Sequence, residues 1–358
     1  MNYKQIIDDT VVPAILSYEE KNEKYKSLIQ YVNRLLPCKL YRFRTCKERN
    51  LDAFYKDELW FSNGSSMNDD FDARLYYDKK KIKNWLDSFI SEEGTLKIID
   101  KILDMKEIPE VFGKYVPNGN CLFNELKMMP RNQINRCLNE IISTISEDLE
   151  KELNLITERV QSMTKFACFT EKLSSDMMWG NYANNATGFA LEYDFGKQNS
   201  VIYKCGDNGN DRIWTHLFPI IYGNQRMDTT AYVMYLFQMR ILMRIAQERG
   251  IPYVNHFSNS ILPCPDEFMA TKLAIKKSND WRQEKEWRMF FTTNNVNYLN
   301  EKYSCVIYKP SAVFLGRKIS SINQKIIMHI ASEKNIPVYK MGFNKNSKTY
   351  SLRKYKLE

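Results

Sequence analysis

The sequence has few of the residues that build a metal centre. It contains only three histidines, His216, His256 and His329, which lie far apart along the chain, and its eight cysteines form no Cys-x-x-Cys pair. Structural zinc sites use four such ligands at short spacings. We therefore expect no metal site, and we expect the cysteines to be reduced residues of a cytosolic protein, several of them in its core.

The signatures of common nucleotide-binding and hydrolytic enzymes are also missing. The chain has no Gly-x-Gly-x-x-Gly, no phosphate-binding Gly-x-x-x-x-Gly-Lys loop, no Gly-x-Ser-x-Gly and no His-Glu-x-x-His. Each of these patterns supplies ligands or backbone geometry that its reaction requires. Their absence argues against the standard forms of dinucleotide oxidoreductase, P-loop nucleotidase, serine hydrolase and zinc protease.

Long apolar runs are absent as well. The first residues include early acids and no apolar segment of the kind that signal peptides have. The longest apolar stretch, residues 231–246, is interrupted by Arg240 and Arg244 and is too short to span a bilayer. We expect a soluble, cytoplasmic protein with no membrane partner.

What is present is an ordinary globular composition with a positive charge. Of 358 residues, 44% are hydrophobic and 27% are charged, and the formal net charge is +9. This composition predicts a folded protein with a large core. The positive excess favours a polyanionic partner such as nucleic acid or a nucleotide phosphate, although a basic surface without a specific partner is at least as common.

Hydrophobic periodicity predicts an α+β protein. Helical spacing marks residues 13–36 as an amphipathic helix and residues 79–163 as several inserted helices. We expect an N-terminal helix within residues 1–36 and then one α+β domain, residues 37–358, with a mixed or split antiparallel sheet that carries this helical insertion. The expected strands are 40–44, 58–62, 166–170, 189–194, several within 201–221, 306–308, 313–316 and 337–341, the last two flanking a helix at 321–334 as a βαβ unit.

The most informative stretch is residues 281–291, where two glutamates lie between two arginines. On a strand, alternate side chains share one face, so the four charged groups would form a row while Trp287 anchors the other face in the core. A salt-bridge ladder explains such a row. A catalytic pair also explains it, because arginines keep a nearby carboxylate ionised to stabilise positive charge or to orient a hydroxyl. The four groups are Arg282, Glu284, Glu286 and Arg288.

Two other segments have functional character. The polar loop 63–72 consists of residues whose side chains bond to the backbone and tolerate unusual dihedral angles. Residues 178–188 predict a short helix that ends at a glycine, with Trp179, Tyr182 and Asn185 close together on its surface. Trp179 suits either docking of the helix on the sheet or stacking on a ligand, whereas the polar tips of Tyr182 and Asn185 favour ligand binding.

Five separated sequence motifs have the same order and similar residues in a known family. They are Leu-Tyr-Arg-Phe-Arg at 40–44, Leu-Trp-Phe-Ser with Asn-Asp-Asp-Phe-Asp at 59–72, Cys-Phe-Thr-Glu with Met-Trp-Gly-Asn-Tyr-Ala-Asn-Asn-Ala-Thr-Gly-Phe at 168–189, Trp-x-x-Glu-Lys-Glu-Trp-Arg at 281–288, and Val-Phe-Leu-Gly at 313–316. In these blocks the chain resembles the bacterial domain-of-unknown-function family 2971 over about residues 40–342. Two positions depart from the family pattern: Asp70 stands where proline is common, and Ala186 stands where histidine is frequent. The family name implies no reaction.

The chain more distantly resembles the ADP-ribosyltransferase superfamily. Its members use a basic residue on an early strand, a hydroxyl at a strand end, an aromatic ring that stacks on nicotinamide, and a late glutamate. This resemblance implies an ADP-ribosyltransferase-like fold with NAD as substrate. It assigns these positions to Arg42 or Arg44, Ser62, Tyr182, and Glu286 with Glu284 as its partner, and the candidate NAD-binding set also includes Trp179, Asn185 and Arg288.

The chemistry of NAD cleavage suits these residue types. As nicotinamide leaves, an oxocarbenium-like centre forms, and a fixed carboxylate that binds the ribose hydroxyl stabilises it. Two arginines on one strand face could bind a pyrophosphate bidentately. The hypothesis requires Arg42, Tyr182 and Glu286 to line one concave pocket.

Three functions follow as hypotheses. The first is an enzyme that cleaves NAD and transfers ADP-ribose to a protein or, favoured by the positive charge, to nucleic acid, in a toxin or antiviral phage-defence role with an antitoxin or other defence partner. The second is a metal-dependent nuclease with Asp69, Asp70 and Asp72 as extra ligands. The third is a non-catalytic sensor or adaptor that binds a nucleotide or a phage component through its arginines.

Overall fold

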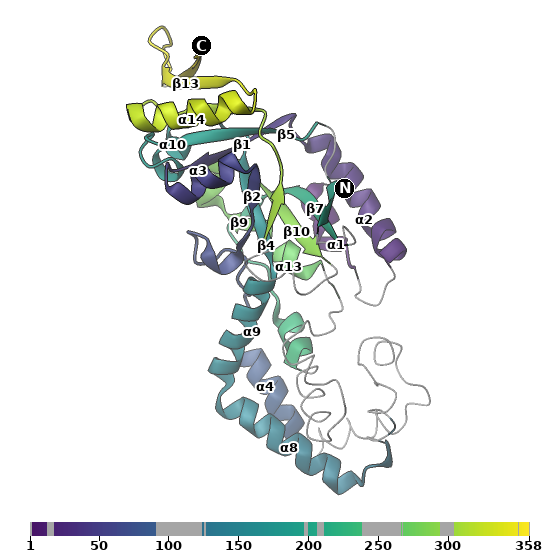
Figure 1. Cartoon of the computed structure of the whole chain (residues 1–358). Helices are drawn as coiled ribbons and strands as arrows, with labels where there is room; N and C mark the ends of the chain where they lie inside the picture. Colours follow the sequence, from purple (N-terminus) through teal and green to yellow (C-terminus); the bar gives the residue numbers. More distant parts are fainter. Residues whose placement is uncertain are drawn as a thin grey trace.

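The fold is centred on one mixed β-sheet. A computed structural model describes residues 2–12, 18–90, 127–196, 200–205, 211–237, 268–293, 304–349 and 351–357, together with residues 124 and 266. Within this part of the chain, nine strands lie in the order β14-β13-β12-β5-β1-β4-β10-β7-β6, and β3 also pairs with β4 (Figure 1). Neighbours are antiparallel except β12 and β13, which are parallel.

The strand bounds follow the short apolar and aromatic segments of the sequence. The sheet contains β1 (Lys39–Arg44), β3 (Ser62–Asn63), β4 (Lys165–Thr170), β5 (Phe189–Asp194), β6 (Ser200–Cys205), β7 (Asp211–Pro219), β10 (Glu286–Thr293), β12 (Ala312–Leu315), β13 (Val338–Phe343) and β14 (Leu352–Lys356). Two small sheets are separate from it: β2 (Glu58–Trp60) pairs with β11 (Cys305–Ile307), and β8 (Ile221–Gly223) runs parallel to β9 (Lys276–Ser278).

Helices cover both faces of the sheet and also extend away from it (Figure 1). They are α1 (Tyr3–Asp9), α2 (Tyr18–Leu35), α3 (Glu48–Tyr55), α4 (Lys79–Ile90), α8 (Arg131–Glu147), α9 (Leu149–Met163), α10 (Asp176–Tyr182), α13 (Met269–Ala274) and α14 (Ser321–Glu333), with 3-10 turns η1 (Gly64–Ser66) and η2 (Asn279–Glu284). Where described, no helix is both long and apolar enough to cross a membrane.

The strand register defines the two faces of the sheet. Glu286 pairs with Thr170, Thr170 with Tyr41, and Tyr41 with Glu192. Because paired residues in antiparallel strands point to the same side, these four side chains share one face, called the acid face below. Helix α10 packs on this face, where Trp179 meets the ring of Phe43 edge-on at 4.9 Å.

Helices α4, α8 and α9 form an arm that projects from the sheet (Figure 1). One face of α8 is apolar at helical spacing and buried through Ile134, Leu138, Ile141 and Ile145. These residues share a core with α4, α9 and the helical residues 230–237. Only Thr164 separates the end of α9 from the start of β4.

Most local predictions from the sequence are confirmed. The α+β class, the mixed sheet, the helices within the described part of 79–163, and the parallel β12-α14-β13 unit are all present. The predicted strand 58–62 is wrong as one element, because β2 pairs with β11 whereas β3 pairs with β4. Helix α1 and strand β14 were not predicted. The sequence also predicts a turn at 206–211, from its run of Gly, Asn and Asp, and a helix at 228–249. The turn lies outside the described residues except for Asp211, and the helix is described only as far as residue 237.

Within the part of the chain that the structure describes, five of the cysteines are free thiols: Cys38, Cys46, Cys137, Cys168 and Cys305. Cys38 is exposed and the other four are partly buried. The expectation of reduced residues therefore agrees with these positions, but Cys38 is not in the core.

Candidate functional site

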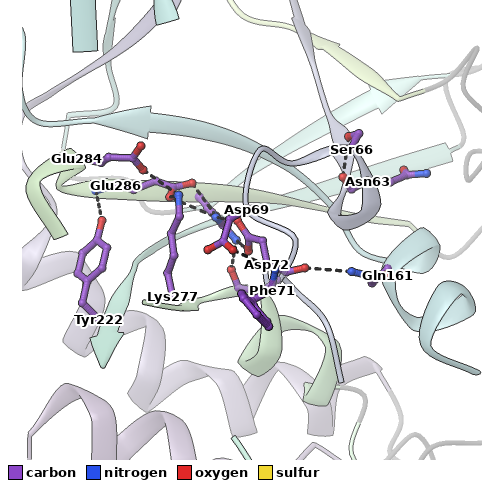
Figure 2. Close-up of polar contacts among 12 residues, drawn as sticks. Asn63, Ser66, Asp69, Phe71, Asp72, Gln161, Tyr222, Lys277, Glu284 and Glu286 are labelled. Carbon is purple, nitrogen blue, oxygen red and sulfur yellow. Dashed lines mark hydrogen bonds and ion pairs between the residues drawn. The ribbon is translucent and has the colours of Figure 1, made fainter. Parts of the chain in front are cut away.

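The two glutamates of the 281–291 segment meet at one ammonium group (Figure 2). Lys277 Nζ, on β9, lies 2.8 Å from Glu284 Oε2 and 2.9 Å from Glu286 Oε2. Glu284 is 3% exposed and Glu286 is 6% exposed. A single buried cation therefore holds both carboxylates and compensates their repulsion.

The route by which the glutamates converge differs from the predicted one. Glu284 ends the 3-10 turn η2, Lys285 has a left-handed backbone with φ of 47°, and only Glu286 begins strand β10. The prediction of one strand face from Arg282 to Arg288 is therefore wrong. Arg282 is exposed, whereas Glu286 and Arg288 do share the acid face.

Arg288 is fully buried and completely engaged. Its guanidinium binds both carboxylate oxygens of Asp72, with Nη1 2.6 Å from Oδ1 and Nη2 2.5 Å from Oδ2. Nε donates to Glu286 Oε1 at 2.7 Å, and Nη1 also donates to the carbonyl of Ala274 at 2.5 Å. With these partners, Arg288 serves to join the loop after η1 to β10, and it is not available for the predicted contact with NAD.

The charges of this cluster fix its protonation. Burial raises the pKa of Glu286, but Arg288 and Lys277 outweigh that effect and lower it to about 2. Burial lowers the pKa of Lys277, yet the nearby carboxylates raise it overall, so its ammonium stays charged. Burial and Glu286 raise the pKa of the Cys168 thiol, which stays neutral. Glu286 is therefore an ionised carboxylate and no proton donor at neutral pH.

Two phenols border the cluster. Tyr182, at the end of α10, donates a hydrogen bond to Glu284 Oε1 at 2.5 Å. Tyr222, on β8, accepts a hydrogen bond from the backbone N–H of Glu286 at 2.9 Å (Figure 2). Burial raises the pKa of both hydroxyls. Tyr182 and the glutamate pair, both predicted site elements, are thus brought together.

A basic groove opens beside the cluster. It has a volume of about 640 Å³, and Tyr222 forms part of its wall. Three cations and no carboxylate occur among the side chains that line it. The lining residues are Lys172, Ser175, Tyr222, Asn279, Arg282, Gln283 and Lys285.

Most of the groove wall comes from η2 and Lys285, and hydrogen bonds on the buried side hold this turn in place. Tyr182 and Lys277 hold the carboxylate of Glu284, and the hydroxyl of Thr170 donates to its carbonyl oxygen at 2.5 Å. The backbone N–H of Glu171 donates to the carbonyl of Lys285 at 3.3 Å. The buried acids therefore fix the turn on which Arg282 and Lys285 are presented to solvent.

Arg42 and Arg44 do not join this site. Tyr41 and Phe43 of β1 point to the acid face, so the alternating Arg42 and Arg44 point to the opposite face. Arg42 is buried there, donates to the carbonyl of Trp60 at 2.7 Å and lies over the ring of Phe169. The required convergence of Arg42 with Tyr182 and Glu286 is therefore wrong, because the register places the full thickness of the sheet between them.

The remaining predicted residues have different surroundings. Ser62 pairs with Phe166, four residues along β4 from the partner of Glu286, which is about 13 Å of strand. Trp179 is fully buried and donates its ring N–H to the carbonyl of Leu173 at 2.8 Å, so it docks α10 on the sheet and is not accessible for stacking. Asn185 is exposed with φ of 54°, in the turn after α10.

The acidic loop predicted for a nuclease has a structural explanation. Asp72 is buried against Arg288, and Asp69 Oδ1 accepts the backbone N–H of Phe71 at 2.9 Å (Figure 2). Asp70 is exposed. Over the described chain, no three His, Cys, Asp or Glu side chains are placed to hold a metal ion.

Sequence reasoning missed several members of the site. Lys277 and Tyr222 lie on short strands that carry no catalytic motif, and the partner of Arg288 was not foreseen. One signal could have pointed to Lys277. Two carboxylates that are buried close together require a compensating cation, and this cation need not be one of the flanking arginines. Of the groove cations, Arg282 and Lys285 belong to the 281–291 segment, whereas Lys172 had no signal beyond the overall positive charge.

Comparison with known protein families finds a match over part of the chain. Residues 178–289 match a family described as "protein of unknown function (DUF2971)". This segment is just under a third of the chain and includes Tyr182, Tyr222, Lys277, Glu284 and Glu286. It supports the resemblance drawn from the sequence blocks. No curated protein and no solved structure matches the chain.

Proposed function

We propose that this chain binds a phosphate-bearing nucleotide in the basic groove and acts as a nucleotide sensor or adaptor. One observation carries the proposal: Lys172, Arg282 and Lys285 surround a groove of about 640 Å³ whose lining contains no carboxylate. Pockets of this size accommodate nucleotide-sized ligands, and several convergent cations favour a di- or polyphosphate.

The buried acid cluster supports binding by preorganising the groove. Its carboxylates are saturated: Glu284 is held by Tyr182 and Lys277, and Glu286 by Lys277 and Arg288. Groups fixed in this way lose little conformational entropy when a ligand arrives. Tyr222 and Asn279 supply a ring and an amide beside the cations, which suit a base or a ribose.

The test is isothermal titration with NAD, ATP and inorganic pyrophosphate. We expect Arg282→Glu/Lys285→Glu to weaken binding of all three ligands at least tenfold, because two attractive charges become repulsive. The matched control is Lys24→Glu/Lys26→Glu on the exposed side of α2, which makes the same change in net charge. Unchanged affinity in the groove variant, or an equal loss in the control, would contradict the proposal.

A second candidate is NAD cleavage with transfer of ADP-ribose to a macromolecule, as in a toxin or phage-defence enzyme with an ADP-ribosyltransferase-like fold. The specific observation in its favour is the hydrogen bond between Tyr182 and Glu284, an aromatic residue and an acid next to the groove. In this function Glu284, after rotation away from Lys277, would bind the ribose hydroxyl and stabilise the oxocarbenium-like centre. Glu286 would remain a structural partner of Arg288.

Nicotinamide release separates the two candidates. The enzyme hypothesis expects wild type to release nicotinamide from NAD and to add mass to RNA, DNA or protein, and it expects Glu284→Gln to abolish both. The matched control for a lost carboxylate is Glu158→Gln, at an exposed position of α9. If NAD binds to the groove without any release of nicotinamide, the sensor function stands and the enzyme function is contradicted.

A further inference from the structure

The positive charge of this protein is concentrated in its last 50 residues. Residues 309–358 contain eleven Lys and Arg against two Asp and Glu, a difference equal to the formal net charge of +9 for the whole chain. The preceding 308 residues are therefore balanced, with equal numbers of basic and acidic side chains. A segregated charge of this kind forms a local field that attracts a polyanion.

The structure places most of this charge at one edge of the sheet. β14 is the terminal strand and pairs with β13, and the hairpin from 338 to 357 carries six Lys and Arg and no acid. Five of its cations are exposed: Lys345, Lys348, Arg353, Lys354 and Lys356.

Exposed aromatic rings lie among these cations. Phe343 is 58% exposed and Tyr355 is 45% exposed. The guanidinium of Arg317 lies 5.0 Å from the centre of the Phe343 ring, and that of Arg353 lies 5.7 Å from the Tyr355 ring. Lys354 Nζ lies 5.0 Å from the ring of Tyr339. Rings with cations beside them are the elements with which proteins stack unpaired bases while binding the adjacent phosphates.

We propose that the β13-β14 hairpin is a binding surface for single-stranded nucleic acid. Lys354 and Lys356 alternate on the acid face of β14, opposite Met341 and Tyr339, and contact phosphates. Phe343 stacks on a base, which a duplex would not offer because its bases are already stacked. This surface is separate from the basic groove, because none of these residues line that groove.

Protection of an edge strand is the alternative explanation for part of this charge. Lysines on a terminal strand discourage pairing with another chain. Such protection requires neither six cations without an acid nor an exposed phenylalanine. Binding measurements distinguish the two roles because only a binding surface gives an affinity that depends on these particular side chains.

The experiment uses fluorescence anisotropy of a labelled oligo-dT of about 20 nucleotides with the full chain, between about 50 and 200 mM salt. We expect Lys354→Glu/Lys356→Glu to weaken binding at least tenfold and to flatten the dependence of log K on log salt by about 1.4, since each phosphate contact on a single strand contributes about 0.7. The control Lys80→Glu/Lys81→Glu, on exposed positions of α4, changes net charge equally and should retain the wild-type slope.

Phe343→Ala tests stacking. We expect roughly tenfold weaker binding with an unchanged salt slope, and recovery in Phe343→Trp. Thermal melts verify folding, and pyrophosphate binding by each hairpin variant shows that the groove is intact, so failure here leaves the proposed function untouched. Equal losses in the α4 control, tighter binding of a duplex of equal length, or binding of phosphatidylserine vesicles in place of the oligonucleotide would each overturn the proposal.

Discussion

Arg288 and Asp72 form a bidentate ion pair inside the core, although 216 positions separate them in the sequence. The pair fastens the loop after η1 to strand β10. The carbonyl of Asp72 also accepts from Gln161 of α9 at 3.1 Å (Figure 2), so the same residue ties the arm to the sheet. Asp72 therefore links three parts of the fold: its own loop, strand β10 and helix α9.

Substitution of Asp72 should destabilise the fold strongly. We expect Asp72→Asn to lower the free energy of unfolding by about 3 kcal/mol, because it leaves a buried guanidinium with one fewer counter-charge. Urea denaturation followed by circular dichroism measures this change. The exposed neighbour Asp70→Asn is the control and should stay within about 0.5 kcal/mol of wild type. Equal effects of the two variants would show that the ion pair contributes little.

The stability of the protein should depend on the ionisation of Glu286. Because its pKa is lowered to about 2 from an ordinary value of 4.5, the ionised form stabilises the fold above pH 4.5, and this contribution is lost as the pH falls through about 2. We expect Glu286→Gln to cost about 3 kcal/mol at pH 7 and progressively less below pH about 4.5. Urea denaturation of both proteins at a series of pH values gives the difference. A difference independent of pH would be inconsistent with a depressed pKa.

The hydroxyl of Tyr182 should contribute to stability through Glu284. A hydrogen bond to a charged group is worth about 2 kcal/mol, so Tyr182→Phe should lower the free energy of unfolding by that amount. Tyr76→Phe, at an exposed ring beside Arg226, keeps the ring and serves as the control with little expected effect. If both variants lose the same stability, the contact between Tyr182 and Glu284 is not the cause.

Two glycines that lie eight residues apart, Gly180 and Gly188, should respond oppositely to substitution by alanine. A Cβ at Gly188 would lie 2.1 Å from the carbonyl oxygen of Arg44, so Gly188→Ala forces the backbone apart and should cost about 2 kcal/mol or more. At Gly180, within α10, a Cβ meets nothing within 4 Å. Gly180→Ala should stabilise the protein by up to about 1 kcal/mol, because alanine favours helix. Melting temperatures of the two variants on either side of wild type would confirm the prediction.

Secondary structure was predictable from the sequence where the pattern of apolar residues within one segment determines it. The alternation in 40–44 and 189–194 predicted β1 and β5, and the helical period of 131–147 predicted α8 within the insertion. The proximity of Glu284 and Glu286 was also predicted, but from a continuous strand that the structure replaces with a 3-10 turn and a left-handed Lys285.

The arrangement of the site depends on strand pairing and on side-chain contacts between distant segments, which the sequence of one segment does not reveal. Alternation shows that Arg42 and Arg44 share a face of β1, but only the pairing of Tyr41 with Thr170 shows that this face is opposite to Glu286. In the same way, Lys277 is seven residues from Glu284, on a strand of its own, and Asp72 reaches Arg288 across most of the chain. Tertiary contacts of this kind leave no periodic trace in the sequence.

The direct passage from α9 through Thr164 into β4 has a mechanical consequence. β4 carries Thr170, whose hydroxyl holds the carbonyl of Glu284, and with only one residue between helix and strand there is no loop to absorb movement. Movement of the arm would therefore pass directly into β4 and, through Thr170, to the turn that presents Arg282 and Lys285.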